Sequence, residues 1–130
     1  SSVKFLGEVS TDQVSKLVSS AHIFAILHQL VYTSISLTSF EAMNFGTPVL
    51  TNAPENLYGN SMIKDGENIV LINRDNVDEI AEKIIFLLEN KHERERIGHN
   101  GKRFIRSFLT WENCAERTEK LYESILLNNN

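Results

Sequence analysis

The chain has 130 residues, of which 42% are apolar and 23% charged, so it can form one domain with a single hydrophobic core. Its formal net charge of −4 and its pI of about 5.5 argue against a nucleic-acid-binding surface, which requires a basic patch. The single cysteine, Cys114, excludes an internal disulfide.

Neither a membrane span nor a targeting segment is present in the sequence. No run approaches the roughly 20 apolar residues of a transmembrane helix. The first residues show no basic-then-apolar signal, although a chain cut from a longer protein would have lost one. We expect a cytoplasmic chain, with peripheral membrane association of the full-length protein left open. No cluster of residues has metal-ligand spacing, so we expect neither a metal site nor a cofactor.

The first quarter of the chain alternates short apolar runs with a helical pattern. Val3–Leu6 is typical of a short strand that ends at Gly7. Ser10 and Gln13 have the spacing of a capping box, in which two side chains satisfy the first N–H groups of a helix. Ile23–Leu27 is a continuous apolar run, which indicates a strand covered on both faces in a parallel sheet.

The next segment contains a short helix between two strands. Thr38 and Glu41 form a second capping-box pattern, which predicts a helix that begins after Thr38. Gly46 predicts its end, because glycine adopts the left-handed conformation at little cost. Val49–Leu50 then predicts a short strand. The N-terminus of such a helix carries a partial positive charge and free N–H groups, so it can bind an anion such as phosphate.

The second half of the chain predicts one further strand and a series of helices. Ile69–Ile72 reads as a strand, and Asp75 as the cap of the helix that follows. Lys91 to Arg106 carries mixed charges typical of a solvated helix, which Gly98 and Gly101 are expected to weaken.

Thr110 is expected to cap the final helix, whose apolar face includes Cys114 as a buried thiol. Residues 128–130 form a polar tail that we expect to fray. Strands that alternate with helices predict an α/β domain. Its parallel sheet should have about four strands, with helices on both faces.

Two short motifs in the centre of the chain resemble the donor-binding segment of retaining GT-B glycosyltransferases, in particular glycosyltransferase family 4. These motifs are Phe40-Glu41-Ala42-Met43 and Gly46-Thr47-Pro48-Val49. Three further segments are similar to that family, in the same order: VKFLGEVS at 3–10, IKDGENIVLI at 63–72 and LTWENCAERTEKLYESIL at 109–126. The resemblance therefore covers nearly the whole chain.

The resemblance implies that residues 1–127 belong to the C-terminal, donor-binding domain of a GT-B enzyme, which has a Rossmann-like parallel sheet. The N-terminal part of that domain and the whole acceptor domain would then be absent. Half of the active-site cleft would be missing with them, so we expect this fragment to be inactive by itself.

The resemblance also implies a reaction: retaining transfer of a sugar from a nucleotide diphosphate sugar to an acceptor, in glycan or polysaccharide biosynthesis. A sugar or lipid-linked acceptor would bind through the absent N-terminal domain. Glu41 would accept hydrogen bonds from the ribose hydroxyls, and Gly7 and Val9 would lie beside the nucleotide base. The donor diphosphate would contact the backbone of the loop and of the first helical turn, at Ser34, Ile35, Ser36, Leu37 and Thr38.

Two alternatives remain open at this point. The family has an earlier glutamate that contacts the donor sugar, and Thr33 occupies its position in this chain. The catalytic residues are therefore not assigned, and a non-catalytic module that binds a nucleotide sugar or a protein partner is the alternative function. Glu41 could equally be a capping residue with no ligand to contact.

Overall fold

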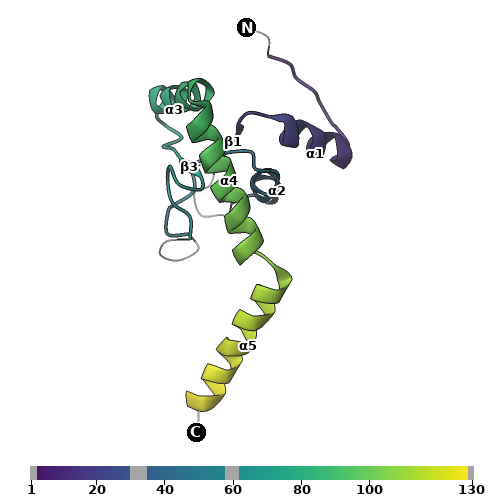
Figure 1. Ribbon diagram of the computed structural model, residues 1–130, viewed down its shortest axis with the longest axis vertical. Helices are drawn as coiled ribbons and strands as arrows, with labels where there is room; N and C mark the ends of the chain where they lie inside the picture. The colour runs from purple at the N-terminus through teal and green to yellow at the C-terminus, as the bar shows by residue number, and fades with distance from the viewer. Residues whose placement is uncertain (1–2, 30–34, 58–61, 129–130) are drawn as a thin grey trace.

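The computed structural model describes residues 3–29, 35–57 and 62–128 (Figure 1). Three strands form a parallel sheet in the order β1-β2-β3, with Ala25 opposite Leu50 and Leu50 opposite Val70. The predicted α/β class and parallel sheet are confirmed. The elements in chain order are α1 (Thr11–Ser20), β1 (Phe24–Ile26), α2 (Leu37–Phe45), β2 (Val49–Thr51), β3 (Val70–Leu71), α3 (Val77–Glu89), α4 (Lys91–Phe108) and α5 (Trp111–Asn128).

Helices pack on both faces of the sheet, because neighbouring residues of each strand point to opposite sides. Val49 of β2 faces α1 and α2, in a core that also contains Val18, Met43 and Phe104. The adjacent Leu50 faces the other side, where the second core consists of Val70, Ile72, Leu87 and Ile97. Both faces of β2 are therefore buried. The strand that the sequence predicted to be covered on both faces was Ile23–Leu27; it forms β1 at the edge of the sheet, where Ala25 is exposed within the described residues, so that part of the prediction is wrong.

The start of α2 corrects the sequence prediction. The helix is capped by Ser36, whose side-chain oxygen accepts a hydrogen bond from the Ser39 backbone N–H at 3.1 Å. Thr38 is already inside the helix, and Glu41 lies in its second turn, too far along to return a hydrogen bond to the cap. The predicted capping box of Thr38 and Glu41 is therefore wrong. Gly46 ends the helix with a φ of 86°, as predicted.

Other helix ends follow the sequence more closely. Ser10 and Gln13 form the predicted capping box at the start of α1. Thr110 caps α5, since its hydroxyl accepts from the Asn113 N–H at 3.2 Å. The predicted cap of α3, Asp75, is wrong by one residue. Asn76 is the cap, because its side-chain oxygen accepts a hydrogen bond from the Glu79 N–H at 3.1 Å.

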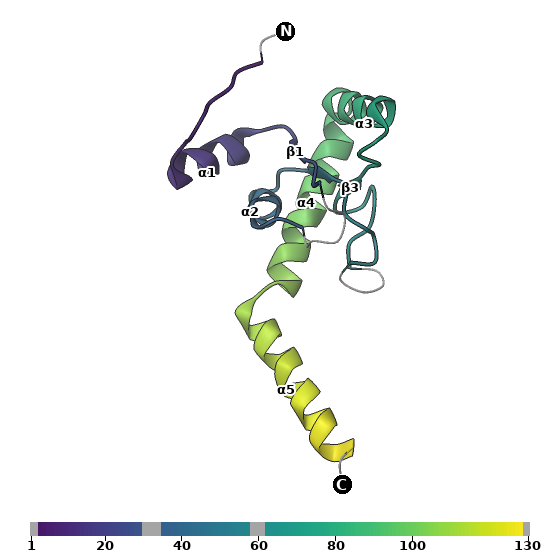
Figure 2. The same ribbon diagram turned by 180° about the vertical axis from the view of Figure 1, so that it is seen from behind.

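The predicted strand at Val3–Leu6 is wrong. This segment runs away from the sheet, as Figure 2 shows from behind, and the Phe5 side chain is 93% exposed. A strand requires a neighbour for its backbone hydrogen bonds. Among the described residues, no segment pairs with 3–6, so the sheet has three strands instead of about four.

Gly101 allows α4 to pack tightly against the body of the domain. A Cβ atom at this position would lie 2.9 Å from the Asn68 carbonyl oxygen, which leaves no room for a side chain. Arg96 on the same helix also connects α4 to the segment before β3, because its guanidinium donates to the Gly66 carbonyl at 2.7 Å. Arg96 also donates to the Glu93 carboxylate, and this hydrogen bond holds the pKa of Glu93 below its ordinary value.

Helix α5 extends away from the body of the domain (Figure 1). Its apolar face is exposed, with the Trp111 side chain 87% accessible and Tyr122 64% accessible. Cys114 lies on this face and is also exposed, so the expected buried thiol is wrong. The spacing of apolar residues predicted this helix and its apolar face correctly. None of the other described residues packs over that face.

Candidate functional site

The N-terminus of α2 lies at the edge of the sheet where the parallel strands end. Helix α2 follows β1 in the chain and returns through the tight turn at Gly46 to the start of β2, so its first turn faces the carboxyl edge. In open α/β sheets this edge is where ligands bind. In the described part of the chain, the backbone N–H groups of Leu37 and Thr38 have no partner. Free N–H groups at a helix N-terminus, together with the helix dipole, favour the binding of an anion.

Side chains around this first turn hold it rigidly. The hydroxyls of Ser36 and Ser39 lie 2.8 Å apart, and Ser39 is fully buried. Ile35, just before the cap, is 1% exposed and packs into the core shared by α1 and α2. The Ile35 side chain is thus an anchor, so only its backbone could contact a ligand.

Glu41 is exposed on the second turn of α2. Within the described residues its carboxylate forms no hydrogen bond or ion pair, so the capping role considered from sequence does not hold. Its role toward a nucleotide stays a prediction.

The remaining predicted site residues are not all brought together. Thr33 and Ser34 lie outside the described residues. Gly7 has a φ of 65° in the segment before α1, and Val9 is half-buried there. Val9 lines a shallow hollow with residues of α1 and the segment before it: Leu6, Gln13, Lys16, Leu17 and Ser20. The nucleotide-base role of Gly7 and Val9 therefore stays a prediction.

A polar network that sequence reasoning missed ties the three strand exits together. Asn52, directly after β2, accepts from the His28 N–H at 2.7 Å and donates to the His28 carbonyl at 2.9 Å. Arg74, beyond β3, donates to the His28 carbonyl at 3.3 Å and also to the Gln29 carbonyl. The signal in the sequence was an asparagine placed directly after a buried strand, where an amide side chain can continue the backbone pairing.

Two buried polar atoms lie at the same edge. Among the residues that the structure describes, the Thr51 hydroxyl and Nε2 of His28 are buried without a hydrogen-bond partner. Buried polar atoms without partners are rare in folded proteins, because each costs about 1–3 kcal/mol of desolvation. The carboxyl edge therefore carries hydrogen-bonding capacity that the described residues leave unused.

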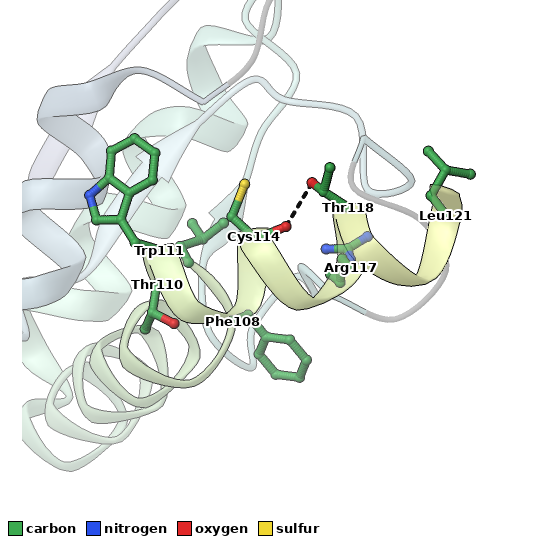
Figure 3. Close-up of a pocket in the computed structure, with 8 residues that line it drawn as sticks. Phe108, Thr110, Trp111, Cys114, Arg117, Thr118 and Leu121 are labelled. Carbon is green, nitrogen blue, oxygen red and sulfur yellow. Dashed lines mark hydrogen bonds between the residues drawn. The ribbon is translucent and has the colours of Figure 1, made fainter. Parts of the chain in front are cut away.

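A larger hollow, of about 650 Å³, lies at the elbow between α4 and α5 (Figure 3). Apolar side chains such as Phe108, Trp111 and Leu121 line it. The Thr118 hydroxyl donates to the Cys114 carbonyl at 2.8 Å, so it serves the helix backbone. This hollow is an exposed helix face without the converging polar groups of a catalytic site.

Among residues 3–29, 35–57 and 62–128, no group of three or more histidine, cysteine, aspartate or glutamate residues could hold a metal ion. None of the helices in these ranges is long and apolar enough to cross a membrane.

The fold is that of an α/β domain with a parallel sheet and helices on both of its faces. The sequence profile of the family described as glycosyl transferases group 1 matches residues 1–104. The chain belongs to this family.

Curated relatives agree with this family. An uncharacterized glycosyltransferase of Methanocaldococcus jannaschii is 27% identical over 125 residues, which cover 96% of this chain and 34% of the relative. An MMP alpha-(1->4)-mannosyltransferase of Mycolicibacterium hassiacum is 30% identical over 118 residues, which cover 91% of this chain and 28% of the relative. The chain thus spans about a third of the length of these relatives.

Solved structures show the same fold. The C-terminal domain of a glycosyl transferase group 1 family protein from Francisella tularensis superposes with a TM-score of 0.63 at 17% identity, covering 84% of this chain and 53% of that chain. Sucrose-phosphate synthase from Thermosynechococcus elongatus superposes with a TM-score of 0.71 at 22% identity, covering 96% of this chain and 30% of that chain.

Proposed function

We propose that this chain is the donor-binding part of a glycosyltransferase and holds a nucleotide diphosphate sugar for retaining transfer to an acceptor. The observation that carries the proposal is the first turn of α2, where the Leu37 and Thr38 N–H groups are free at the carboxyl edge of a parallel sheet. Membership of the group 1 family supplies the reaction class.

The chemistry follows from the charge that develops on the leaving diphosphate. As the bond to the sugar breaks, negative charge accumulates on the diphosphate oxygens. Backbone N–H groups held in place by the Ser36 cap, together with the helix dipole, stabilise that charge without having to reorganise. Glu41 is exposed in the second helical turn and unpaired within the described residues, so its carboxylate is free to accept from ribose hydroxyls.

The acceptor binds elsewhere in this proposal, on a second domain that completes the cleft. The curated relatives are about three times as long as the part of them that this chain matches. A mannosyltransferase among them supports a hexose donor, and glycan or polysaccharide synthesis as the setting. The chain tested by itself should not transfer sugar. Cytoplasmic location and peripheral membrane association of the full-length protein belong to the same proposal.

A non-catalytic module that binds a nucleotide sugar is the second candidate function. The observation in its favour is Thr33, a neutral side chain at the position where the family resemblance expects a glutamate for the donor sugar. Such a module would bind donors and transfer none.

The test is a titration of the full-length protein with UDP-, GDP- and ADP-sugars, with turnover measured in parallel. Saturable binding of one donor together with sugar transfer supports the enzyme. Binding without turnover on any acceptor supports the non-catalytic module. Absence of binding to every nucleotide sugar in the panel contradicts both.

A further inference from the structure

We propose that Asn52 and Arg74 are positioning residues for the donor, because they fix the chain as it leaves β1 on its way to α2. This inference rests on the proposed function. It adds two residues that follow β2 and β3 and whose contacts shape the site without touching the ligand.

The side-chain amide of Asn52 pairs with the backbone of His28 in the way that a residue of a neighbouring strand would. This amide accepts from the His28 N–H at 2.7 Å and donates to the His28 carbonyl at 2.9 Å. The pairing of β1 with β2 ends at Ile26 and Thr51, so these two bonds extend it beyond the end of the ladder. Asn52 is 6% exposed, and buried hydrogen bonds of this kind hold their partners in one geometry.

Arg74, which follows β3 at the other end of the strand order, also contacts the chain just after β1. Its guanidinium donates to the carbonyls of His28 and Gln29, and it pairs with the neighbouring Asp75 at 3.2 Å. The exit of β1 is therefore held by side chains from beyond β2 and beyond β3.

These contacts bear on the donor because the exit of β1 and the first turn of α2 are the two ends of one connection. Ser36 fixes the helix end through its cap, and Asn52 and Arg74 fix the strand end. Sites that bind through backbone groups depend on such supports, since a shift of about 1 Å can cost up to a hundredfold in function.

The chain contains a matched control for each residue at the opposite edge of the sheet. The Asn68 side chain makes the same pair of contacts before β3: it accepts from the Lys64 N–H at 3.0 Å and donates to the Met62 carbonyl at 2.9 Å. Arg96 donates to the Gly66 carbonyl and pairs with Glu93, as Arg74 does with its own partners. Asn68 and the Gly66 carbonyl that Arg96 contacts both precede β3, whereas the contacts of Asn52 and Arg74 follow the ends of the strands.

The experiment measures nucleotide-sugar affinity by calorimetry and thermal unfolding, on the full-length protein and on four variants. Asn52→Ala and Asn68→Ala each remove two side-chain-to-backbone hydrogen bonds, so both should lower the melting temperature. We expect Asn52→Ala to weaken donor binding about tenfold or more, and Asn68→Ala to leave it within about twofold. Arg74→Ala and Arg96→Ala should repeat this contrast.

The arginine pair decides the question if Asn52→Ala does not fold, since Arg74 is partly exposed. Donor affinity that falls no further in Asn52→Ala and Arg74→Ala than in their controls overturns the positioning role and leaves the proposed function intact. A parent protein that binds no nucleotide sugar overturns the proposed function, and the positioning role with it.

Discussion

The carbonyl oxygen of Gly46 occupies the space that a side chain on Gly98 would need. A Cβ atom at residue 98 would lie 2.1 Å from that oxygen and 3.3 Å from Cδ of Pro48. The turn that ends α2 and begins β2 therefore rests directly on the backbone of α4. This contact sets the position of α2, and with it the position of the candidate site.

Gly98→Ala should destabilise the domain even though alanine is the better helix former. The new methyl group must displace backbone atoms, and overpacking of this kind costs about 1–3 kcal/mol. His99→Ala, on the exposed side of the same helix, is the control and should change little. Denaturant unfolding measures both free energies, and a Gly98→Ala protein at least as stable as the parent would contradict the tight contact.

Two buried threonines should respond in opposite directions to the same substitution. The Thr47 hydroxyl donates to the Val18 carbonyl at 2.8 Å, whereas the Thr51 hydroxyl has no partner among the described residues. Thr47→Val should therefore lower the free energy of unfolding by about 1 kcal/mol, and Thr51→Val should raise it by a similar amount. Thermal unfolding of the two variants is the check, and a loss of stability in Thr51→Val would mean that its hydroxyl is hydrogen-bonded.

The revised helix start changes which side chain stabilises α2. Ser36→Ala should cost about 1 kcal/mol, because it removes the acceptor of the Ser39 N–H. Thr38→Ala should be close to neutral, since Thr38 lies inside the helix. A larger loss at Thr38 than at Ser36 in denaturant unfolding would restore the original capping assignment.

Glu41→Gln should separate ligand binding from stability. Its carboxylate has no partner within the described residues, so the melting temperature should stay near that of the parent. Charge-assisted hydrogen bonds to ribose hydroxyls are worth about 1.5–3 kcal/mol each, so nucleotide affinity should fall about tenfold or more. Titration of the full-length variant with the preferred donor tests this, and unchanged affinity removes Glu41 from the site.

The sequence predicted the elements whose cause is local or periodic. Apolar runs located β1, β2 and β3, and Gly46 and Thr110 marked helix ends correctly. The cap of α2 was misassigned because Ser36 and Thr38 are both good capping residues, and the choice depends on how Ile35 packs into the core.

Features that depend on contacts distant in sequence could not be predicted. Gly98 looked like a weak point of a helix, because its contact with Gly46 spans 52 positions and only the fold brings the two together. Val3–Leu6 has a strand-like pattern but no partner within the described residues. The tie between Asn52 and His28 likewise appears only when the strands are aligned.

The most direct test of donor binding at the first turn of α2 is amide hydrogen–deuterium exchange of the full-length protein, with and without its preferred nucleotide sugar. The free N–H groups of Leu37 and Thr38 should exchange more slowly when the diphosphate accepts hydrogen bonds from them. The Asn113 amide at the start of α5, already bonded to Thr110, serves as the internal reference. Saturating donor that leaves the exchange of Leu37 and Thr38 unchanged would contradict the site.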